Sequence, residues 1–381
     1  MDFGWSDQQR ELFDAVVSFA RKQLGSDIIE RDKNGTFDSR GWKQCGEFGI
    51  QGLPVPEEHG GLGQDALTTV GALEQLGYAC RDNGLTFSIN AHLWTAAMPI
   101  VAFGTDEQKA KFLPGLSDGS LIGGNAMSEP GSGSDAYSLR TTAELDGNSY
   151  ILNGSKTYVT NGPIADVLVV FATVDRSQAE RGITAFLVEK GTHGMSVAKK
   201  LEKMGLRTSP MAEIFFEDCK IPAENRLGRE GAGTSLFTHS MNWERGCILA
   251  TAVGSMQYML DTCIRFAKER KQFGQSIGKF QLVATKIVDM KLRLQSARHM
   301  LYYGAWLRSL GKTAILEAAM AKLEISESWV KCCEDAIQIH GGSGYMTEYE
   351  IERELRDAIG SKLYSGTSEI QRTIIASLLG L

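Results

Sequence analysis

Glu244 is the residue whose type and surroundings most clearly predict chemistry. If residues 237 to 251 form a helix, the neighbours three, four and seven positions away are Phe237, Ser240, Met241, Cys247, Ile248 and Thr251. This face is mainly apolar, and burial there raises the pKa of a carboxyl toward the range that suits a general base. A hydroxyl that donates to the carboxylate acts in the opposite direction. Periodicity alone leaves two other interpretations open, an ion pair with a distant Lys or Arg and a solvated edge of the helix.

A loop rich in Gly, Ser and Pro is the second candidate. Residues 126 to 135 read Ala-Met-Ser-Glu-Pro-Gly-Ser-Gly-Ser-Asp. Small residues let backbone N–H groups approach a ligand closely, and Ser128 and Ser134 add hydroxyl donors. The alternative is a plain surface turn, which is the more common use of such a composition.

These residues need a scaffold, and the sequence predicts three successive zones. Residues 1–120 place apolar residues at helical spacing, residues 121–231 contain β-branched and aromatic runs, and residues 232–381 return to long helical patterns. We therefore expect an α+β protein with an N-terminal helical domain, a small middle β domain and a C-terminal helical domain. Inside the β zone, the pair Asn153-Gly154 predicts the tight turn of a hairpin.

Composition excludes several classes of protein. The 381 residues are 43% hydrophobic and 23% charged, which is typical of a soluble chain with two or three packed units. The net charge of -6 and the lack of a dense Lys/Arg run predict no nucleic-acid partner. The seven cysteines contain no Cys-x-x-Cys pair, so we expect reduced thiols and no metal site. The start shows no leader pattern and no apolar run has membrane length, which predicts a cytoplasmic protein without membrane contact.

Several motifs resemble those of the acyl-CoA dehydrogenase family and follow the family's order. They occupy residues 126–135, 156–162, 269–274, 338–345, 352–357 and 362–372. The resemblance spans nearly the whole chain. It implies a barrel-like middle domain, a C-terminal four-helix bundle and FAD as the cofactor.

The resemblance also implies the residues that contact FAD. Those that would line the isoalloxazine are Met127, Ser128, Ser134, Tyr158 and Thr160, with Thr160 close to flavin N5. Those that would hold the pyrophosphate and adenosine across a dimer contact are Arg270, Gln272, Phe273, Gln281, Gln338 and Gly342. The remaining cofactor residues are Gly133, Gly341, Thr367 and Glu369, the last two near the FAD of the chain's own subunit. Gly341-Gly342 is equally typical of a helix C-cap. Family members are usually homotetramers, a dimer of dimers.

The position of the catalytic base in this chain differs from its position in most members of the family. Most members carry a glutamate at the position of Ser365, and a serine hydroxyl cannot take that role unaided. The segment from Asn242 to Arg245 resembles the helix on which isovaleryl-CoA and long-chain dehydrogenases carry their base. The resemblance implies that Glu244 removes the α-proton of an acyl thioester while a hydride passes from the β-carbon to flavin N5. It further implies that the Ser365 backbone N–H binds the thioester oxygen and that Arg245 supports the wall of the site.

The acyl group is the finer question. Within the family, the chain most resembles the L-prolyl-carrier-protein dehydrogenases and oxidases, which implies a prolyl group on a carrier protein in secondary metabolism. Trp94 and Trp243 could narrow the substrate pocket, and core packing explains them equally well. The alternatives are a short-chain or branched-chain acyl-CoA dehydrogenase, a flavin monooxygenase on the same fold, and a flavin-binding protein without catalysis. The sequence does not decide whether the acyl group is carried by CoA or by a carrier protein. It also does not decide whether an electron-transfer flavoprotein or O2 accepts the electrons.

Overall fold

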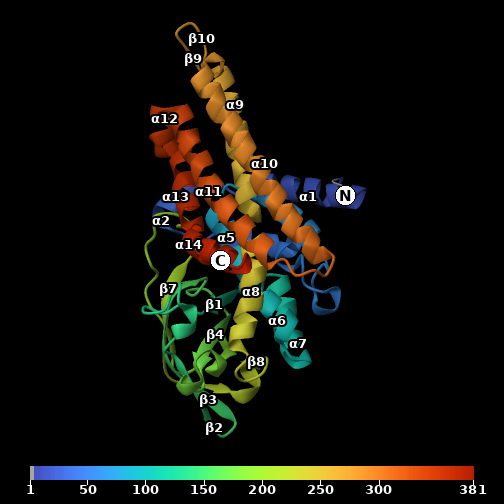
Figure 1. Ribbon diagram of the computed structural model, residues 1–381, viewed down its shortest axis with the longest axis vertical. Helices are drawn as coiled ribbons and strands as arrows, with labels where there is room; N and C mark the ends of the chain where they lie inside the picture. Colours follow the sequence, from blue (N-terminus) through green and yellow to red (C-terminus); the bar gives the residue numbers. More distant parts are fainter. Residues whose placement is uncertain (1–3) are drawn as a thin grey trace.

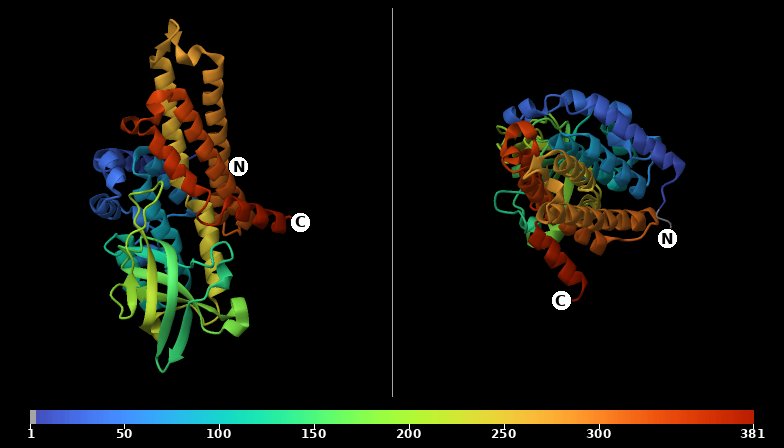
Figure 2. Two further views of the ribbon diagram at one scale, coloured as in Figure 1. Left: turned by 90° about the vertical axis from the view of Figure 1, so that its left-hand side faces the viewer. Right: turned by 90° about the horizontal axis from the view of Figure 1, so that it is seen from above.

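Helices, a sheet and helices again follow one another along residues 4–381, the part of the chain that the computed structural model describes. The molecule is elongated, with the C-terminal bundle at one end and the sheet at the other (Figure 1). The N-terminal helices lie beside the junction of the two, and the last helix projects from the body (Figure 2). The predicted α+β class is confirmed. The division at residues 120 and 231 stays a prediction.

The N-terminal part is helical because its apolar residues recur on buried faces and its helix starts are capped. Its helices are α1 (Asp7–Gln23), α2 (Ile28–Asn34), α3 (Ser39–Phe48), α4 (Ala66–Ala79), α5 (Asn83–His92), α6 (Met98–Phe103) and α7 (Asp106–Ser117). Ser6 caps α1 and Asp65 caps α4 through side-chain bonds to backbone N–H groups. A π-helical turn, Leu93–Ala97, joins α5 to α6 and is completely buried. Such turns are frequent at functional sites.

The middle part is one sheet of eight strands. The strands are β1 (Gly123–Ala126), β2 (Thr142–Asp146), β3 (Ser149–Thr160), β4 (Val167–Thr173), β5 (Ile183–Glu189), β6 (Met195–Val197), β7 (Met211–Pro222) and β8 (Arg226–Leu227). Their order is β6-β7-β3-β2-β4-β5-β8, and β1 pairs in parallel with β4. Every residue of β4 is buried, which explains why it is a continuous run of Val, Leu, Phe and Ala without alternation.

The hairpin predicted at Asn153-Gly154 is wrong. Strand β3 continues through these residues, because both of its halves pair with β7. Asn153 exchanges two hydrogen bonds with Asp218, and the pairing register shifts between Leu152 and Gly154. The pair therefore forms an irregularity in the strand. The tight turn lies just upstream at residues 147–148, where Gly147 has a φ of 59°.

The C-terminal part is a bundle with a hairpin at its tip. Its elements are α8 (Gly233–Cys247), α9 (Ala250–Glu269), β9 (Lys271–Gln272), β10 (Gln275–Ser276), α10 (Gln281–Ser309), α11 (Ile315–His340), α12 (Gly342–Tyr345), α13 (Ile351–Ser361) and α14 (Ser368–Leu378). The helix predicted over 237–251 ends earlier, at Cys247. The stretch Gly233–Glu269 is long and apolar enough to cross a membrane, but 72% of its most apolar window is buried inside the protein. We therefore interpret α8 and α9, which make up this stretch, as core helices of the protein.

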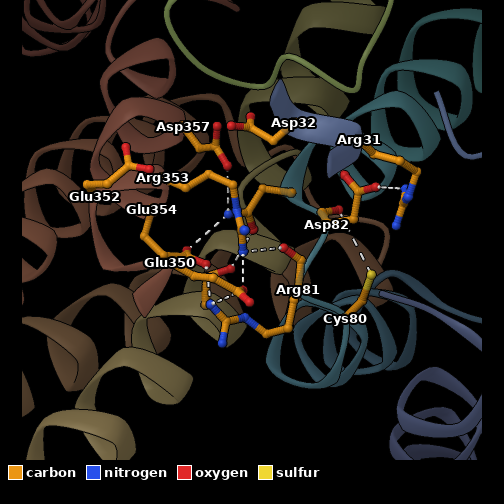
Figure 3. A network of polar contacts seen from close by, with 12 residues as sticks. Arg31, Asp32, Cys80, Arg81, Asp82, Glu350, Glu352, Arg353, Glu354 and Asp357 are labelled. Atoms are coloured by element: carbon orange, nitrogen blue, oxygen red, sulfur yellow. Dashed lines mark hydrogen bonds and ion pairs between the residues drawn. The ribbon is translucent and has the colours of Figure 1, made fainter. Parts of the chain in front are cut away.

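Buried charges join the N-terminal helices to α13 and to the loop before β7 (Figure 3). The guanidinium of Arg81 lies 3.2 Å from Glu354 and 3.6 Å from Glu350. Asp357 accepts a hydrogen bond of 2.5 Å from the Leu206 N–H. Burial and the charge of Glu354 raise the pKa of Asp357 to about 7. These contacts fix α13, which leads directly into the turn at residues 362–367.

Candidate functional site

Glu244 and Ser365 meet in the structure although they are 121 residues apart. Glu244 lies on α8 and is only 7% exposed. The Ser365 Oγ donates a hydrogen bond of 2.5 Å to Glu244 Oε1. The second oxygen, Oε2, is buried and has no hydrogen-bond partner in residues 4–381. One oxygen is therefore held in place while the other is free to accept a proton.

Several effects act on the acidity of Glu244. Burial raises its pKa, whereas the Ser365 hydrogen bond and the charges of Arg245 and Lys322 act in the opposite direction. The net direction is upward. Burial was one of the interpretations that the sequence left open, with a hydroxyl of the same helix face as a possible donor. The donor is instead Ser365, whereas Ser240 donates to the Trp94 carbonyl at 3.2 Å. A buried carboxylate with a raised pKa is suited to general-base catalysis.

The turn that carries Ser365 has a strained backbone held by side chains. Ser365 has a φ of 57°, a left-handed conformation that non-glycine residues rarely adopt. Its carbonyl accepts hydrogen bonds from Arg245 Nε at 3.3 Å and Gln371 Nε2 at 3.1 Å. Within residues 4–381, the Ser365 N–H makes no hydrogen bond. An unpaired N–H beside a base is the geometry that an oxyanion requires.

The loop at residues 127–135 is built on a buried ion pair that the sequence argument missed. Lys156 is fully buried, and its Nζ donates to Glu129 Oε1 at 2.8 Å and to the Met127 carbonyl at 3.1 Å. Burial acts to raise the pKa of Glu129, but Lys156 and the bonds from Thr141 outweigh it, so the pKa lies below its usual value. The Thr157 N–H also donates to the Ser128 carbonyl at 2.9 Å. These contacts bring the predicted residues of the loop beside those at the end of β3.

The groups on this surface fit a flavin. The hydroxyls of Ser128, Ser134 and Thr160 have no hydrogen-bond partner in the described part of the chain. A Cβ added at Gly133 would meet nothing within 4 Å, so the loop leaves open space. Tyr158 has a φ of 55° and is 68% exposed, which presents an aromatic side chain on the same surface. Free donors beside an exposed aromatic ring suit a planar ring with polar edges.

The structure does not bring all predicted FAD residues together. Arg270, Gln272 and Phe273 lie in the β9–β10 segment at the tip of the bundle, at the opposite end of the molecule from β3 (Figure 1). Gln281 starts α10 next to this hairpin, and Gln338, Gly341 and Gly342 lie at the end of α11 and the start of α12. Thr367 caps α14, and Glu369 lies in its first turn. The residues beside β3 and those at the tip of the bundle can contact the same FAD molecule only if a second copy of the chain supplies one of these two sets.

Trp94 and Trp243 stack on one another between the π-helical turn and α8. Their ring centroids are 5.9 Å apart and the planes are 5° from parallel. The Trp94 indole N–H donates to Asn90 Oδ1 at 2.9 Å. Trp243 also faces a cavity of about 200 Å³, and the Arg308 guanidinium lies 4.9 Å from its ring. We call this stacked pair the tryptophan wall; Trp243, but not Trp94, lines the cavity.

In residues 4–381, neither the cysteines nor any cluster of side chains able to bind a metal forms a second functional site. All seven cysteines are buried and unpaired, as expected for reduced thiols. Within residues 4–381 no group of three or more His, Cys, Asp or Glu is arranged to hold a metal ion.

Comparison with known families matches three consecutive parts of the chain. The acyl-CoA dehydrogenase N-terminal domain matches residues 6–120, the middle domain matches residues 124–219, and the C-terminal domain matches residues 231–380. Together they account for most of the sequence.

Full-length relatives and solved structures agree with these matches. The L-prolyl-[peptidyl-carrier protein] dehydrogenase of Pseudomonas fluorescens is 42% identical and covers 100% of both chains. The crystal structure of the prolyl acyl carrier protein oxidase AnaB is 54% identical, with a TM-score of 0.98 over 99% of this chain and 100% of that one. The structure of PigA with FAD and proline is 41% identical, with a TM-score of 0.98 and full coverage of both chains.

Proposed function

The chain belongs to the acyl-CoA dehydrogenase family and is an FAD-dependent oxidoreductase, and we propose that Glu244 is the base with which it desaturates an acyl thioester. The observation that carries this assignment is the buried Glu244 carboxylate with one oxygen held by Ser365 and the other unpartnered. Oε2 takes the α-proton of the thioester. The Ser365 N–H donates to the thioester oxygen, where negative charge develops as the proton leaves. Bound FAD supplies the acceptor for the hydride that leaves the β-carbon.

We assign the isoalloxazine to the surface formed by the 127–135 loop and the end of β3. The unpartnered hydroxyls of Ser128, Ser134 and Thr160 hold its polar edges, and Tyr158 and Met127 line it. The pyrophosphate and adenosine lie on a second copy of the chain, at its β9–β10 hairpin and at the end of its α11. Phe273 in that hairpin is 93% exposed, so its ring is accessible to a second copy of the chain.

We further propose that the chain works as a homotetramer, a dimer of dimers, as the family resemblance implies; the divided cofactor site by itself requires at least a dimer. Light scattering on the FAD-loaded protein tests this assembly. A monomer that keeps FAD would contradict it.

The proposed substrate is a prolyl group carried as a thioester on a carrier protein. The support is the identity to two relatives whose names mention a prolyl group on a carrier protein, 42% over 100% of this chain and 54% over 99% of it. The stacked Trp94 and Trp243 agree with a small acyl group, because they fill the space between α8 and the π-helical turn. The alternative is a short-chain or branched-chain acyl-CoA dehydrogenase, which the same wall would also suit.

A panel of thioesters tests the substrate. Prolyl carrier protein, prolyl-CoA, butyryl-CoA and isovaleryl-CoA are each mixed with the FAD-loaded protein without oxygen, and flavin bleaching is followed. We expect the fastest bleaching with prolyl carrier protein and a product lighter by two hydrogens. A product that gains oxygen identifies a monooxygenase, and the absence of bleaching with every thioester identifies a flavin-binding protein without this catalysis.

The electron acceptor is proposed to be O2 or an electron-transfer flavoprotein. Two similar proteins differ in this respect by name, one an oxidase and the other a dehydrogenase. The rate at which the bleached flavin recovers its colour in air, compared with its recovery with an electron-transfer flavoprotein, separates the two.

A further inference from the structure

Lys322 on α11 is a buried cation for which the proposed mechanism has no use. Its side chain has no exposed surface. In the described residues its Nζ makes one hydrogen bond, 2.7 Å to the Gly366 carbonyl, and no carboxylate lies within salt-bridge distance. Burial lowers the pKa of Lys322 to about 8, against the effect of Glu244. A buried ammonium without a carboxylate partner is unfavourable, so its presence calls for an explanation.

Packing does not explain a charge at this position. The neighbours one helical turn and two turns away on the same face are the buried residues Ala318, Ala319, Ile325, Ser326 and Trp329. A methionine has a similar length and would fill the space without the cost of desolvating an ammonium. The ammonium must therefore act on the groups that it faces.

The first of these groups is the turn that carries Ser365. A non-glycine residue in the left-handed conformation costs about 1 kcal/mol or more, and it persists only where surrounding contacts impose it. The Gly366 carbonyl follows Ser365 by one peptide, and it accepts hydrogen bonds from Lys322 Nζ and from Gln371 Nε2 at 2.9 Å. Lys322 thus anchors the peptide between Gly366 and Thr367, the second peptide after Ser365, and helps to hold the turn that carries the Ser365 hydroxyl and N–H.

The second group is Glu244. Three effects favour the ionised carboxylate against the effect of burial. The hydrogen bond from Ser365 is the largest, the charge of Arg245 comes next, and the charge of Lys322 is the third. The charged groups that face Lys322 are Glu244 and Arg245 on α8, Glu327 on α11 and Glu369 on α14. The ring of Tyr364, 6.0 Å from Nζ, completes its surroundings.

We propose that Lys322 is a positioning residue, which holds the Ser365 turn in its strained conformation and supplies a positive charge that keeps Glu244 ionised. The inference rests on the proposed role of Glu244 as base. It adds a residue that touches neither substrate nor reacting atoms, and that acts through Ser365 and Glu244.

The test separates the hydrogen bond from the charge. Lys322→Met removes both, Lys322→Gln keeps a donor for the Gly366 carbonyl, and Lys322→Arg keeps the charge. Lys331→Met is the matched control, because it removes an exposed lysine of the same helix, which pairs with Glu334 at 2.7 Å and lies outside the site. Each FAD-loaded protein is mixed with prolyl carrier protein without oxygen, and the flavin reduction rate is measured against pH.

We expect Lys322→Met to reduce the limiting rate about tenfold to hundredfold, the range for misaligning one oxyanion donor. Its acid midpoint should rise, because one nearby positive charge that favours the ionised carboxylate is lost. Lys322→Gln should show the raised midpoint with a smaller loss of rate, while Lys322→Arg and Lys331→Met should keep the midpoint of the parent protein.

Two outcomes would overturn the proposal. One is an unchanged acid midpoint in both Lys322→Met and Lys322→Gln. The other is a loss of FAD or of folding in all three Lys322 variants without a change of midpoint in the material that remains folded, which marks a purely structural role. A failure of the base assignment appears separately, as an unchanged rate in Glu244→Gln.

Discussion

Ser365→Ala tests whether the hydroxyl of Ser365 sets the acidity of Glu244. The substitution removes the hydrogen bond of 2.5 Å to Oε1 and leaves the backbone N–H in place. It therefore separates the side chain of Ser365 from its proposed oxyanion contact.

The magnitude follows from the type of bond. A hydrogen bond to a charged group contributes about 1.5–3 kcal/mol. One pKa unit corresponds to about 1.36 kcal/mol, so losing a bond that stabilises only the ionised carboxylate raises the pKa of Glu244 by about 1–2 units. Loss of this hydrogen bond and burial of the carboxyl both raise the pKa of Glu244.

The assay is the rate of flavin reduction against pH, measured in single turnovers without oxygen. We expect the acid midpoint of Ser365→Ala to rise by the shift given above, while the rate well above the midpoint stays close to that of the parent protein. Ser365→Gly is the matched variant, because it also lacks the hydroxyl but relieves the φ of 57°. It should show the same midpoint and a free energy of unfolding about 1 kcal/mol higher than that of Ser365→Ala.

An acid midpoint in Ser365→Ala equal to that of the parent protein would refute the reasoning. A fall in rate of equal size at every pH would also refute it, because that result assigns Ser365 to transition-state binding and not to the acidity of Glu244.

Three further predictions concern the buried carboxylates and the tryptophan wall. Because the pKa of Glu244 is higher in the folded protein than in the unfolded chain, stability falls as the pH rises from the unfolded pKa through the folded one. Glu244→Gln should therefore raise the melting temperature more at alkaline than at acid pH, and equal shifts at both would contradict this. Glu129→Gln leaves the buried Lys156 without a charged partner, so we expect a loss of about 3 kcal/mol in the free energy of unfolding and less bound FAD; an unchanged denaturation midpoint would count against it. Trp243→Ala should open the site toward the cavity of about 200 Å³ and raise the relative rate with hexanoyl-CoA over butyryl-CoA, whereas an unchanged ratio would remove the wall from the specificity argument.

The sequence predicted the surroundings of Glu244 better than those of its partners. Periodicity places local neighbours, and the buried position of Glu244 on α8 agrees with one of the interpretations that it left open. The contact with Ser365 depends on how α8 and the turn before α14 pack, which no local pattern specifies. Lys322 was missed, although its signal was the same as that of Glu244, a charged residue on an otherwise apolar helix face.

The β domain shows why local turn signals fail. Asn153-Gly154 has the composition of a tight turn, but pairing of β3 with β7 on both sides outweighs this preference. The Glu129–Lys156 pair was likewise invisible, because its two residues come from different elements and their spacing follows no motif. Spacing alone also gave no sign that the predicted flavin residues lie at two ends of the molecule, because their distance in space depends on how the bundle and the sheet pack.

The most direct test of the central claim is flavin reduction in Glu244→Gln. Gln has nearly the same shape but cannot take a proton from the α-carbon. The variant and the control Glu334→Gln, whose carboxylate is exposed and pairs with Lys331, are loaded with FAD and mixed with prolyl carrier protein without oxygen. We expect the rate to fall by about three orders of magnitude or more in Glu244→Gln and to stay unchanged in the control. FAD reduction by Glu244→Gln at the rate of the parent protein would contradict the account.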